Sequence, residues 1–190
     1  LQAELYEELV EIATSPMAAD CGPTTSIHYV HGLALLKLDR HAEAIEPLRE
    51  CIATRDEPAF TARFKGVEGH GPHPLLADCL AKTGSGKAAT QEFERALEMT
   101  PEATSVRWGF ARVHTEEGQP EKAIGLLYDA IENGSIDCRL WSLGCNIANG
   151  HLSDAEVALH WTDCAITECP EHPEIQKQRG GALLTVGRFK

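Results

Sequence analysis

The stretch Thr83-Gly-Ser-Gly-Lys-Ala88 contains residue types that could hold a nucleotide phosphate. A phosphate-binding P-loop has the pattern G-x-x-x-x-G-K-[ST], because its first glycine opens the loop and the hydroxyl after the lysine holds magnesium. Here Ala81 stands in place of the first glycine, and Ala88 stands in place of the hydroxyl residue. Both requirements fail, so we expect no nucleotide at this stretch, which needs another explanation.

Two pairs of histidines have a spacing that a metal site could use. His28 and His31 are three residues apart, so a helix would place both imidazoles on one side. His70 and His73 have the same spacing in the Gly- and Pro-containing segment 69–74. Neither pair has further ligands at a regular distance, as a zinc site requires. We therefore expect no metal and no cofactor. We assign His28 and His31 to packing or surface roles and place His70 and His73 in a flexible loop.

The cysteines could supply zinc ligands, disulfides or a nucleophile. Their number is odd and no C-x-x-C pair occurs, so neither a zinc site nor a disulfide framework is indicated. We expect reduced thiols and a cytoplasmic location. Cys79 and Cys164 fall on apolar helix faces, where a thiol is usually a small buried hydrophobe, and a Cys/His hydrolase is the weakest of our hypotheses. The seven cysteines are Cys21, Cys51, Cys79, Cys138, Cys145, Cys164 and Cys169.

The composition is that of a folded protein with an acidic balance. Of the 190 residues, 43% are hydrophobic and 24% are charged, which argues against a disordered chain. The formal net charge of -12 would repel nucleic-acid phosphates and anionic lipids, so we expect neither as a partner. No apolar run approaches the roughly 18 residues that span a bilayer, so we expect no membrane insertion. Because the first residue is Leu1 and not methionine, we expect a piece of a longer protein.

Small residues recur at a distance of 34 residues, and this period organises the chain. The pairs are Gly84 and Gly118, Ala89 and Ala123, and Ala96 and Ala130. Apolar residues around them recur at helical spacing, and no segment alternates as a strand would. In each unit a glycine would end one helix, and a polar residue, Ser85 or Gln119, would cap the next. Pro120 suits a first helical position, so the Gly-Ser-Gly-Lys stretch is predicted to be a turn between two helices.

This period and pattern resemble the tetratricopeptide (TPR) repeat, whose signature is W-x₂-L-G-x₂-Y, then A-x₃-F, then A and P. The best unit has Ala77-x₂-Leu80, Gly84, Ala89-x₃-Phe93, Ala96 and Pro101. The resemblance implies an all-α fold, a right-handed α-α superhelix of antiparallel helix pairs. The two helices of each unit would approach closely at the small residues Gly32, Ala77, Ala111 and Gly144.

The TPR resemblance also implies a division of the chain. Residues 1–22 would form an N-terminal capping helix, with Leu5, Leu9 and Ile12 as its apolar stripe, or the remnant of a preceding repeat. Ser153 and Glu156 would form a capping box. The partial unit would expose an apolar face, so we expect self-association or fraying there. The array over 23–190 would comprise units at about 25–58, 70–103, 104–137 and 138–172, an insertion at 59–69, and a partial unit at 173–190.

TPR arrays hold their ligands on a concave face, and the resemblance places specific residues there. Trp108 and Trp141 would point toward it from position five of their units, although a role in packing stays equally open. The mixed charges of the other residues argue against one highly charged ligand. The carboxylate clamp of chaperone-binding TPR proteins is absent, because its Lys and Asn positions are occupied by other residues. The other expected residues are Tyr29, Lys37, Asp78, Lys82, Arg112, Glu116, Asn149 and Lys177.

Two functions from different classes follow from this resemblance. The first is a non-enzymatic scaffold whose concave groove binds a peptide or a partner protein. The second is an accessory region of an enzyme, because residues 60–135 look like the TPR tails of some bacterial glycosyltransferases. The chain has no D-x-D motif for a metal-bound sugar nucleotide, so any such catalysis would lie outside it.

Overall fold

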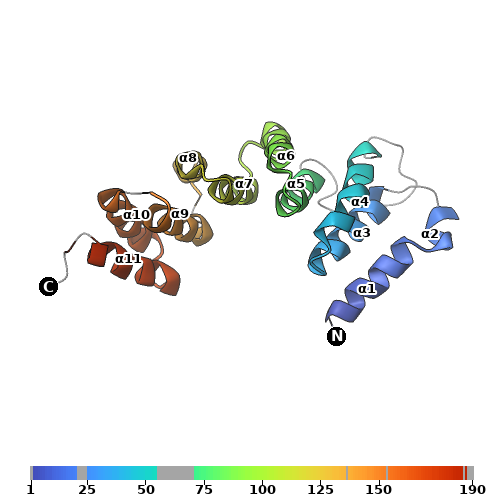
Figure 1. Ribbon diagram of the computed structural model, residues 1–190, viewed down its shortest axis with the longest axis horizontal. Coiled ribbons are helices and arrows are strands. Elements are labelled where there is room, and N and C mark those ends of the chain that lie inside the picture. Colours follow the sequence, from blue (N-terminus) through green and yellow to red (C-terminus); the bar gives the residue numbers. More distant parts are fainter. Residues whose placement is uncertain are drawn as a thin grey trace. The chain divides into compact units, whose positions relative to one another are not determined.

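The computed structural model describes residues 2–20, 25–54, 71–135, 137–152, 154–185 and 187. These residues form eleven α-helices and no strand, which confirms the all-α prediction (Figure 1). The helices are α1 (Gln2–Ala13), α2 (Pro16–Asp20), α3 (Thr25–Lys37), α4 (His41–Ala53), α5 (Pro72–Lys82), α6 (Gly86–Met99), α7 (Thr104–Glu116), α8 (Pro120–Glu132), α9 (Cys138–Gly150), α10 (Ala155–Glu168) and α11 (Pro173–Thr185). The chain divides into two compact units, Leu1–Pro101 and Glu102–Lys190.

The first unit contains two helix pairs and the N-terminal helices. Helix α3 packs against α4, α4 against α5, and α5 against α6. Helix α1 packs against α3, just as α4, the second helix of its pair, packs against α5, the first helix of the next pair. No residue of α1 is fully buried, and two residues of its predicted apolar stripe, Leu5 and Ile12, are 53% and 64% exposed. Helix α1 is therefore held much more loosely than the helix pairs.

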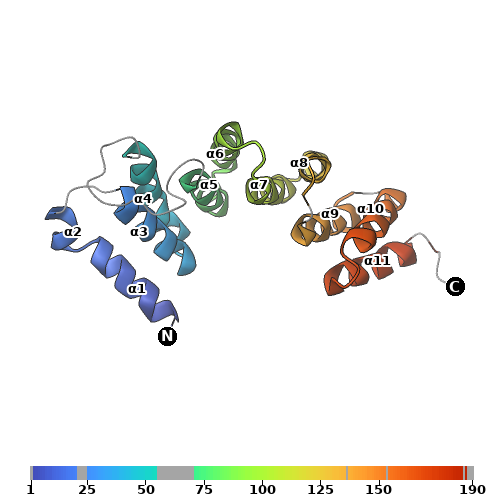
Figure 2. The same ribbon diagram turned by 180° about the vertical axis from the view of Figure 1, so that it is seen from behind.

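The second unit also contains two helix pairs, followed by a single helix. Helix α7 packs against α8, α8 against α9, α9 against α10, and α10 against α11. The first helices of successive pairs, α7 and α9, also contact each other, and α9 contacts α11, as the views in Figures 1 and 2 illustrate. Because each helix packs on its chain neighbours, the core of this unit runs from α7 to α11.

The turns between paired helices depend on single residues with a left-handed backbone. Gly84 has a φ of 81° and Gly118 a φ of 72°, which confirms the predicted turns. Ser85 and Gln119 occupy the N-cap positions of α6 and α8, but neither side chain makes a capping hydrogen bond, so that part of the prediction is wrong. In the α3–α4 turn Asp39 takes the left-handed place, with a φ of 56°.

The small residues allow the close approach of paired helices that the sequence predicted. A β-carbon on Gly32 would lie 2.7 Å from Leu48 Cγ of the paired helix, well inside contact distance. Ala77 and Ala111 occupy the same place in their pairs, and both are fully buried. Larger side chains at these positions would force the helices apart.

Helix α10 begins one residue later than the predicted capping box implies. Its N-cap is Asp154, whose carboxylate accepts hydrogen bonds from the backbone N–H groups of Glu156 (3.0 Å) and Val157 (3.2 Å). A carboxylate suits this position because it satisfies otherwise unpaired N–H groups. Ser153, the predicted insertion at 59–69 and His70 lie outside the described residues.

A disulfide joins Cys138, the first residue of α9, to Cys169, the residue after α10, with a Cα–Cα distance of 5.9 Å. The prediction that all cysteines are reduced is therefore wrong for these two. They are 31 residues apart, but the helix pair folds back and brings its two ends together. Disulfides persist in oxidising compartments, so the expected cytoplasmic location loses its main support. Within the described ranges, no helix is long and apolar enough to cross a membrane.

Candidate binding surface

Helix α7 presents a strip of three side chains that the sequence singled out. The guanidinium carbon of Arg112 lies 5.0 Å from the ring centroid of Trp108, and Nη2 lies 3.6 Å from Oε1 of Glu116. Trp108 and Arg112 are half-buried and Glu116 is exposed. The cation–π contact contributes about 0.5–1 kcal/mol, so it favours this arrangement of the strip before any ligand arrives.

Side-chain amides connect α9 and α11. The Asn149 amide donates to the main-chain oxygen of Gln178 (3.2 Å) and to its side-chain oxygen (3.1 Å). The Gln178 amide donates in turn to Asn146 Oδ1 and to Glu174 Oε1 (3.1 Å). We call Asn146, Asn149 and Gln178 the amide cluster. Among the described contacts, the Nδ2 group of Asn146 and the Oδ1 atom of Asn149 have no hydrogen-bond partner.

Of this cluster, the sequence predicted only Asn149. Asn146 and Gln178 were missed because the alignment assigned neither to the concave face. A signal existed in the spacing of Asn146 and Asn149, since residues three apart lie on one side of a helix. Lys177, which was expected on the same face, is exposed, and its Nζ lies 3.4 Å from Oε1 of Glu174.

Trp141 belongs to the core of the second unit. It is 7% exposed, and its ring makes an edge contact with Trp161 at a centroid distance of 5.3 Å. The structure therefore places this ring in the packing role that the sequence had left open, and leaves little of it on the surface. Trp108, by contrast, keeps part of its ring accessible beside Arg112.

The predicted residues of the first unit lie on α3 and α5. Tyr29 and Asp78 are half-buried, whereas Lys37 and Lys82 are exposed. Burial, together with nearby Cys51, raises the pKa of the Tyr29 phenol, so this group stays a neutral hydrogen-bonding side chain. None of the four residues lines the cavities described next.

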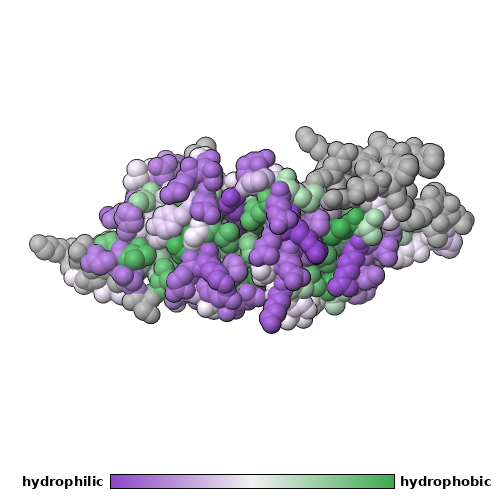
Figure 3. All heavy atoms as spheres, turned by 90° about the horizontal axis from the view of Figure 1, so that it is seen from above, coloured by the Kyte–Doolittle hydropathy of each residue, from purple (hydrophilic) through white to green (hydrophobic). Residues whose placement is uncertain are grey.

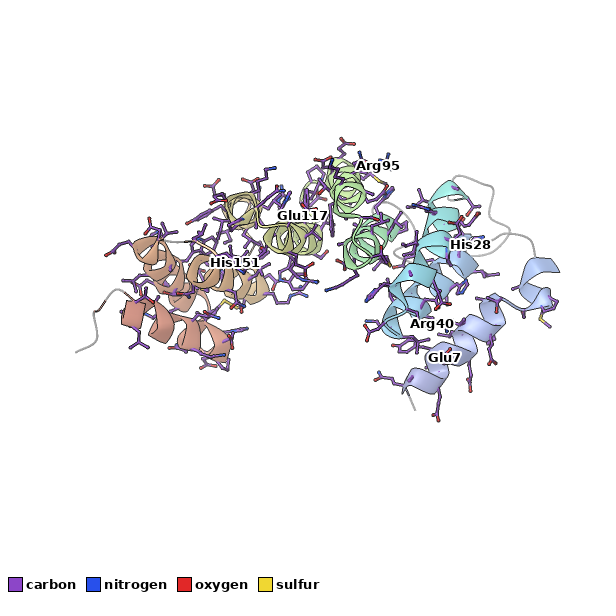
Figure 4. The ribbon with its side chains drawn as sticks, in the orientation of Figure 1. Glu7, His28, Arg40, Arg95, Glu117 and His151 are labelled. Atoms are coloured by element: carbon purple, nitrogen blue, oxygen red, sulfur yellow. A yellow bond between two sulfur atoms is a disulfide. The ribbon has the colours of Figure 1, made fainter. Side chains whose placement is uncertain are left out.

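Two cavities lie beside α1 instead. One, of about 560 Å³, opens between α1, α3 and α4, and its polar lining is Thr14, His28, His31, Arg40, Glu43, Glu46 and Glu50. Figure 4 labels Glu7, His28 and Arg40, which come from α1, α3 and the turn before α4. The other, of about 220 Å³, is almost wholly apolar and lies between α1, α2 and α3. We call the first of these the His–Glu cavity.

A buried ionic group lies in the α5–α6 pair. The Nδ1 atom of His73 lies 2.7 Å from Oε2 of Glu92, whose other oxygen accepts a 2.6 Å hydrogen bond from Arg95. Burial raises the pKa of Glu92, but the His73 hydrogen bond and the Arg95 and His73 charges outweigh it, so this pKa is lowered. The ionised carboxylate therefore accepts from the imidazole N–H. The sequence had placed His73 in a loop, and the structure places it in the first turn of α5, 5% exposed.

The free thiols of the described residues are not activated. Burial raises the pKa of Cys51 to about 11, and burial is also the main cause that raises those of Cys79 and Cys145 to about 12. Cys164 lies 3.8 Å from His160 Nε2, yet burial and two neighbouring carboxylates raise its pKa as well. A thiol nucleophile needs a lowered pKa, so nothing here supports a Cys/His hydrolase. The same residues contain no group of three side chains that could hold a metal ion.

The surface between these features is mixed in character. In the view of Figure 3, hydrophobic residues show in small areas separated by hydrophilic side chains. A surface of this kind suits partners with alternating polar and apolar groups better than a lipid face. It agrees with the mixed charges noted along the first helices.

No protein-family model matches the chain, and no curated protein matches it. Solved structures do. MamA from Desulfovibrio magneticus RS-1 is 16% identical, with 86% of this chain and 85% of that chain covered and a TM-score of 0.66. YrrB, described as a TPR protein with an unusual peptide-binding site, is 17% identical, with 98% and 85% covered and a TM-score of 0.68.

A third structure is a tetratricopeptide repeat protein from Parabacteroides merdae ATCC 43184. It is 12% identical, with 96% of this chain and 74% of that chain covered and a TM-score of 0.69. These identities are low, but the helix pairs of this chain superpose on those of several repeat proteins over most of its length. The chain therefore has the fold of the tetratricopeptide repeat proteins.

Proposed function

We propose that this chain is a non-catalytic scaffold that binds an extended peptide, or an extended segment of a partner protein, on the first helices of its second unit. The binding surface would comprise the α7 strip (Trp108, Arg112, Glu116) and the amide cluster. The proposal rests above all on that cluster, in which the NH₂ group of Asn146 and the Oδ1 atom of Asn149 stay available to a ligand.

The chemistry of an extended peptide matches this arrangement. Each residue of such a peptide carries an N–H donor and a C=O acceptor that must be satisfied when it is bound. Side-chain amides can both donate and accept, so they pair with peptide groups without regard to sequence. Gln178 holds Asn146 and Asn149 in place, which lowers the entropy lost on binding. YrrB, of the same fold, is described as having a peptide-binding site.

The α7 strip would add preference for particular side chains. An indole ring beside a guanidinium offers an apolar face and a charge to the peptide at once. Arg112 and Glu116 carry opposite charges, so the strip favours neither strongly acidic nor strongly basic ligands. We expect bound peptides to carry an apolar or aromatic side chain at this point.

Selection from a random dodecapeptide library, with the whole chain as target, supplies the probe peptides for a test. Each selected peptide is then titrated calorimetrically against the parent protein, Asn149→Ala and Asn146→Ala. We expect each substitution to weaken binding about tenfold, about 1.4 kcal/mol. The control is Asn133→Ala, which removes an exposed amide from the turn after α8 and should change the Kd less than twofold.

Hydrogen exchange with bound peptide provides a second readout. Protection should increase in α9 and α11, where the amide cluster lies. Peptides that bind with unchanged Kd to both cluster variants, and that protect other helices, would overturn this assignment of the binding surface.

The alternative, an accessory region of a glycosyltransferase, gains no support from the described residues or from these solved structures.

Self-association through α11 stays a prediction of its own. Leu184 of that helix is 66% exposed, and exposed apolar side chains favour association. Light scattering over a concentration series would detect a rising mass, and a constant monomer mass would contradict the prediction.

A further inference from the structure

Three lining residues of the His–Glu cavity differ in their surroundings or type from the corresponding residues of the other helix pair in the first unit. The α3–α4 pair aligns with the α5–α6 pair at an offset of 45 residues. This offset separates Gly32 from Ala77 and Ala44 from Ala89. In this alignment His28 corresponds to His73. By the same offset, Pro47 of α4 corresponds to Glu92 of α6.

This difference leaves an imidazole unpaired. The Nδ1 atom of His73 hydrogen-bonds to Glu92, whereas the α4 residue that corresponds to Glu92 is Pro47, whose ring has nothing to donate or accept. The Nε2 atom of His28 is buried and has no hydrogen-bond partner among the described residues. Leaving a buried polar atom unsatisfied is unfavourable, so the imidazole of His28 is a place where a bound polar group would lower the free energy.

A second substitution opens the space that such a group would fill. His31 corresponds to Leu76 of the α5–α6 pair, which is packed at 3% exposure. Where that pair has a close-packed leucine, the α3–α4 pair has a half-buried imidazole at the edge of a cavity of about 560 Å³. Departures from local packing rules of this kind are typical of functional sites.

The charges of the cavity select its ligand. Arg40 is its only cation in the described lining, and this guanidinium is already engaged, by Glu43 at 2.8 and 2.6 Å and by Glu7 at 3.1 Å. Glu46 has only a 3.7 Å contact with Arg49 outside the cavity, and Glu50 has no ion pair within the described ranges. An anion would meet these two carboxylates, so the site is suited to a cation.

We propose that the His–Glu cavity receives a basic side chain, arginine or lysine, of a partner peptide. Its aliphatic stem lies along Val10, Leu35 and Pro47, and its charged head lies between Glu46 and Glu50. The head then lies beside the imidazole of His28, whose Nε2 has no partner among the described residues. Two imidazoles without a third protein ligand do not form a metal site, which leaves an organic cation as the fitting occupant.

This site is independent of the surface proposed above. It lies in the first unit and includes residues of α4, the second helix of its pair. The amide cluster lies in the second unit, on α9 and α11. Either site can bind without the other. Variants of one unit therefore test one proposal at a time.

The test is an NMR titration of the ¹⁵N-labelled whole chain with the capped pentapeptide Ala-Ala-Arg-Ala-Ala. The matched peptide carries citrulline, which has the shape of arginine without its charge. We expect the arginine peptide to bind at least tenfold more tightly and to shift amide signals of α3 and α4. Equal affinity of the citrulline peptide, or shifts confined to other helices, would overturn the proposal. The small cation n-butylguanidinium forms a third arm, and its binding as tightly as the peptide would overturn the assignment to a peptide partner.

Charge-neutral variants complete the experiment. Glu46 and Glu50 are exposed, so Glu46→Gln and Glu50→Gln should leave the fold intact, and each should weaken the arginine peptide about tenfold. Glu94→Gln on α6 removes an exposed carboxylate from the same unit and should leave the Kd within twofold. Unchanged affinity in both cavity variants would contradict the proposal even if the peptide binds.

Discussion

Gly144 of α9 lies directly against the indole ring of Trp161 in α10. A β-carbon on Gly144 would lie 2.6 Å from Cζ3 and 2.9 Å from Cε3 of that ring. Trp161 is 1% exposed, with Trp141 and Tyr128 against its faces and edges at centroid distances of 5.3 and 4.5 Å. The ring therefore has no room to move away, and this helix pair depends on the absence of a side chain at position 144.

The first prediction concerns this contact. Gly144→Ala should destabilise the protein by about 1–3 kcal/mol, because an added methyl group overpacks a rigid ring. Gly125→Ala in α8 is the control, since no atom lies within 4 Å of its new β-carbon. It should stabilise the helix by about 0.5–1 kcal/mol. Urea unfolding followed by tryptophan fluorescence measures both, and a Gly144→Ala variant as stable as the parent would contradict the prediction.

The second prediction concerns the buried carboxylate of Glu92, which is 8% exposed. Glu92→Gln should destabilise the chain by about 1–3 kcal/mol at pH 7, because it replaces charged hydrogen bonds to His73 and Arg95. The folded-state pKa is lowered despite burial, so the stabilisation is present above the unfolded pKa and is lost as pH falls through the folded pKa.

Denaturant unfolding at pH 7 and at pH 3.5 tests this linkage. The parent should lose more stability on acidification than Glu92→Gln does. Glu94→Gln, an exposed carboxylate two residues away, should behave as the parent does at both pH values. An equal acid loss in the parent and in Glu92→Gln would show that the pair contributes no such linkage.

The third prediction concerns His31 in the His–Glu cavity. Burial lowers the pKa of His31, the charges of His28 and Arg40 lower it further, and Glu43 opposes them. Glu7 of α1 is paired with Arg40, which lines the same cavity. The neutral form is thus favoured in the folded chain, so stability is full above the unfolded pKa and is lost as pH falls through the folded pKa.

Proton NMR of the imidazole Cε1–H can follow His31 directly. Its midpoint in the folded protein should lie below that of the same residue in the urea-unfolded chain. The His31→Leu variant identifies the signal, and it should also lose less stability than the parent between pH 7 and pH 5.5. Identical midpoints in the two states would contradict the prediction.

The fourth prediction concerns the disulfide between Cys138 and Cys169. The double variant Cys138→Ser/Cys169→Ser should lose about 2–4 kcal/mol, because the cross-link restricts the unfolded chain. Cys164→Ser, at a half-buried free thiol of the same unit, should have a smaller effect. Alkylation of the denatured, unreduced chain followed by peptide mapping should leave these two cysteines unmodified. Their complete alkylation would exclude the cross-link.

Much of the fold was predictable because it depends on residues that act locally. The turns at Gly84 and Gly118 require a left-handed backbone, and glycine adopts it without a steric penalty. Helical periodicity and the 34-residue recurrence of small residues predicted the helix pairs. Asp39 shows the limit of this reasoning, because a residue other than glycine occupies the left-handed position in the α3–α4 turn.

Features that join separate helices were not predictable in the same way. The Cys138–Cys169 bond, the burial of Trp141 against Trp161 and the link from Asn149 to Gln178 each depend on two residues that only folding brings together. Residue spacing describes one helix at a time, whereas contacts depend on how two helices are rotated and shifted against each other. The sequence by itself determined that helices pair and where they turn. The tertiary structure decided which side chains meet, because small changes in helix packing determine which groups lie within bonding distance.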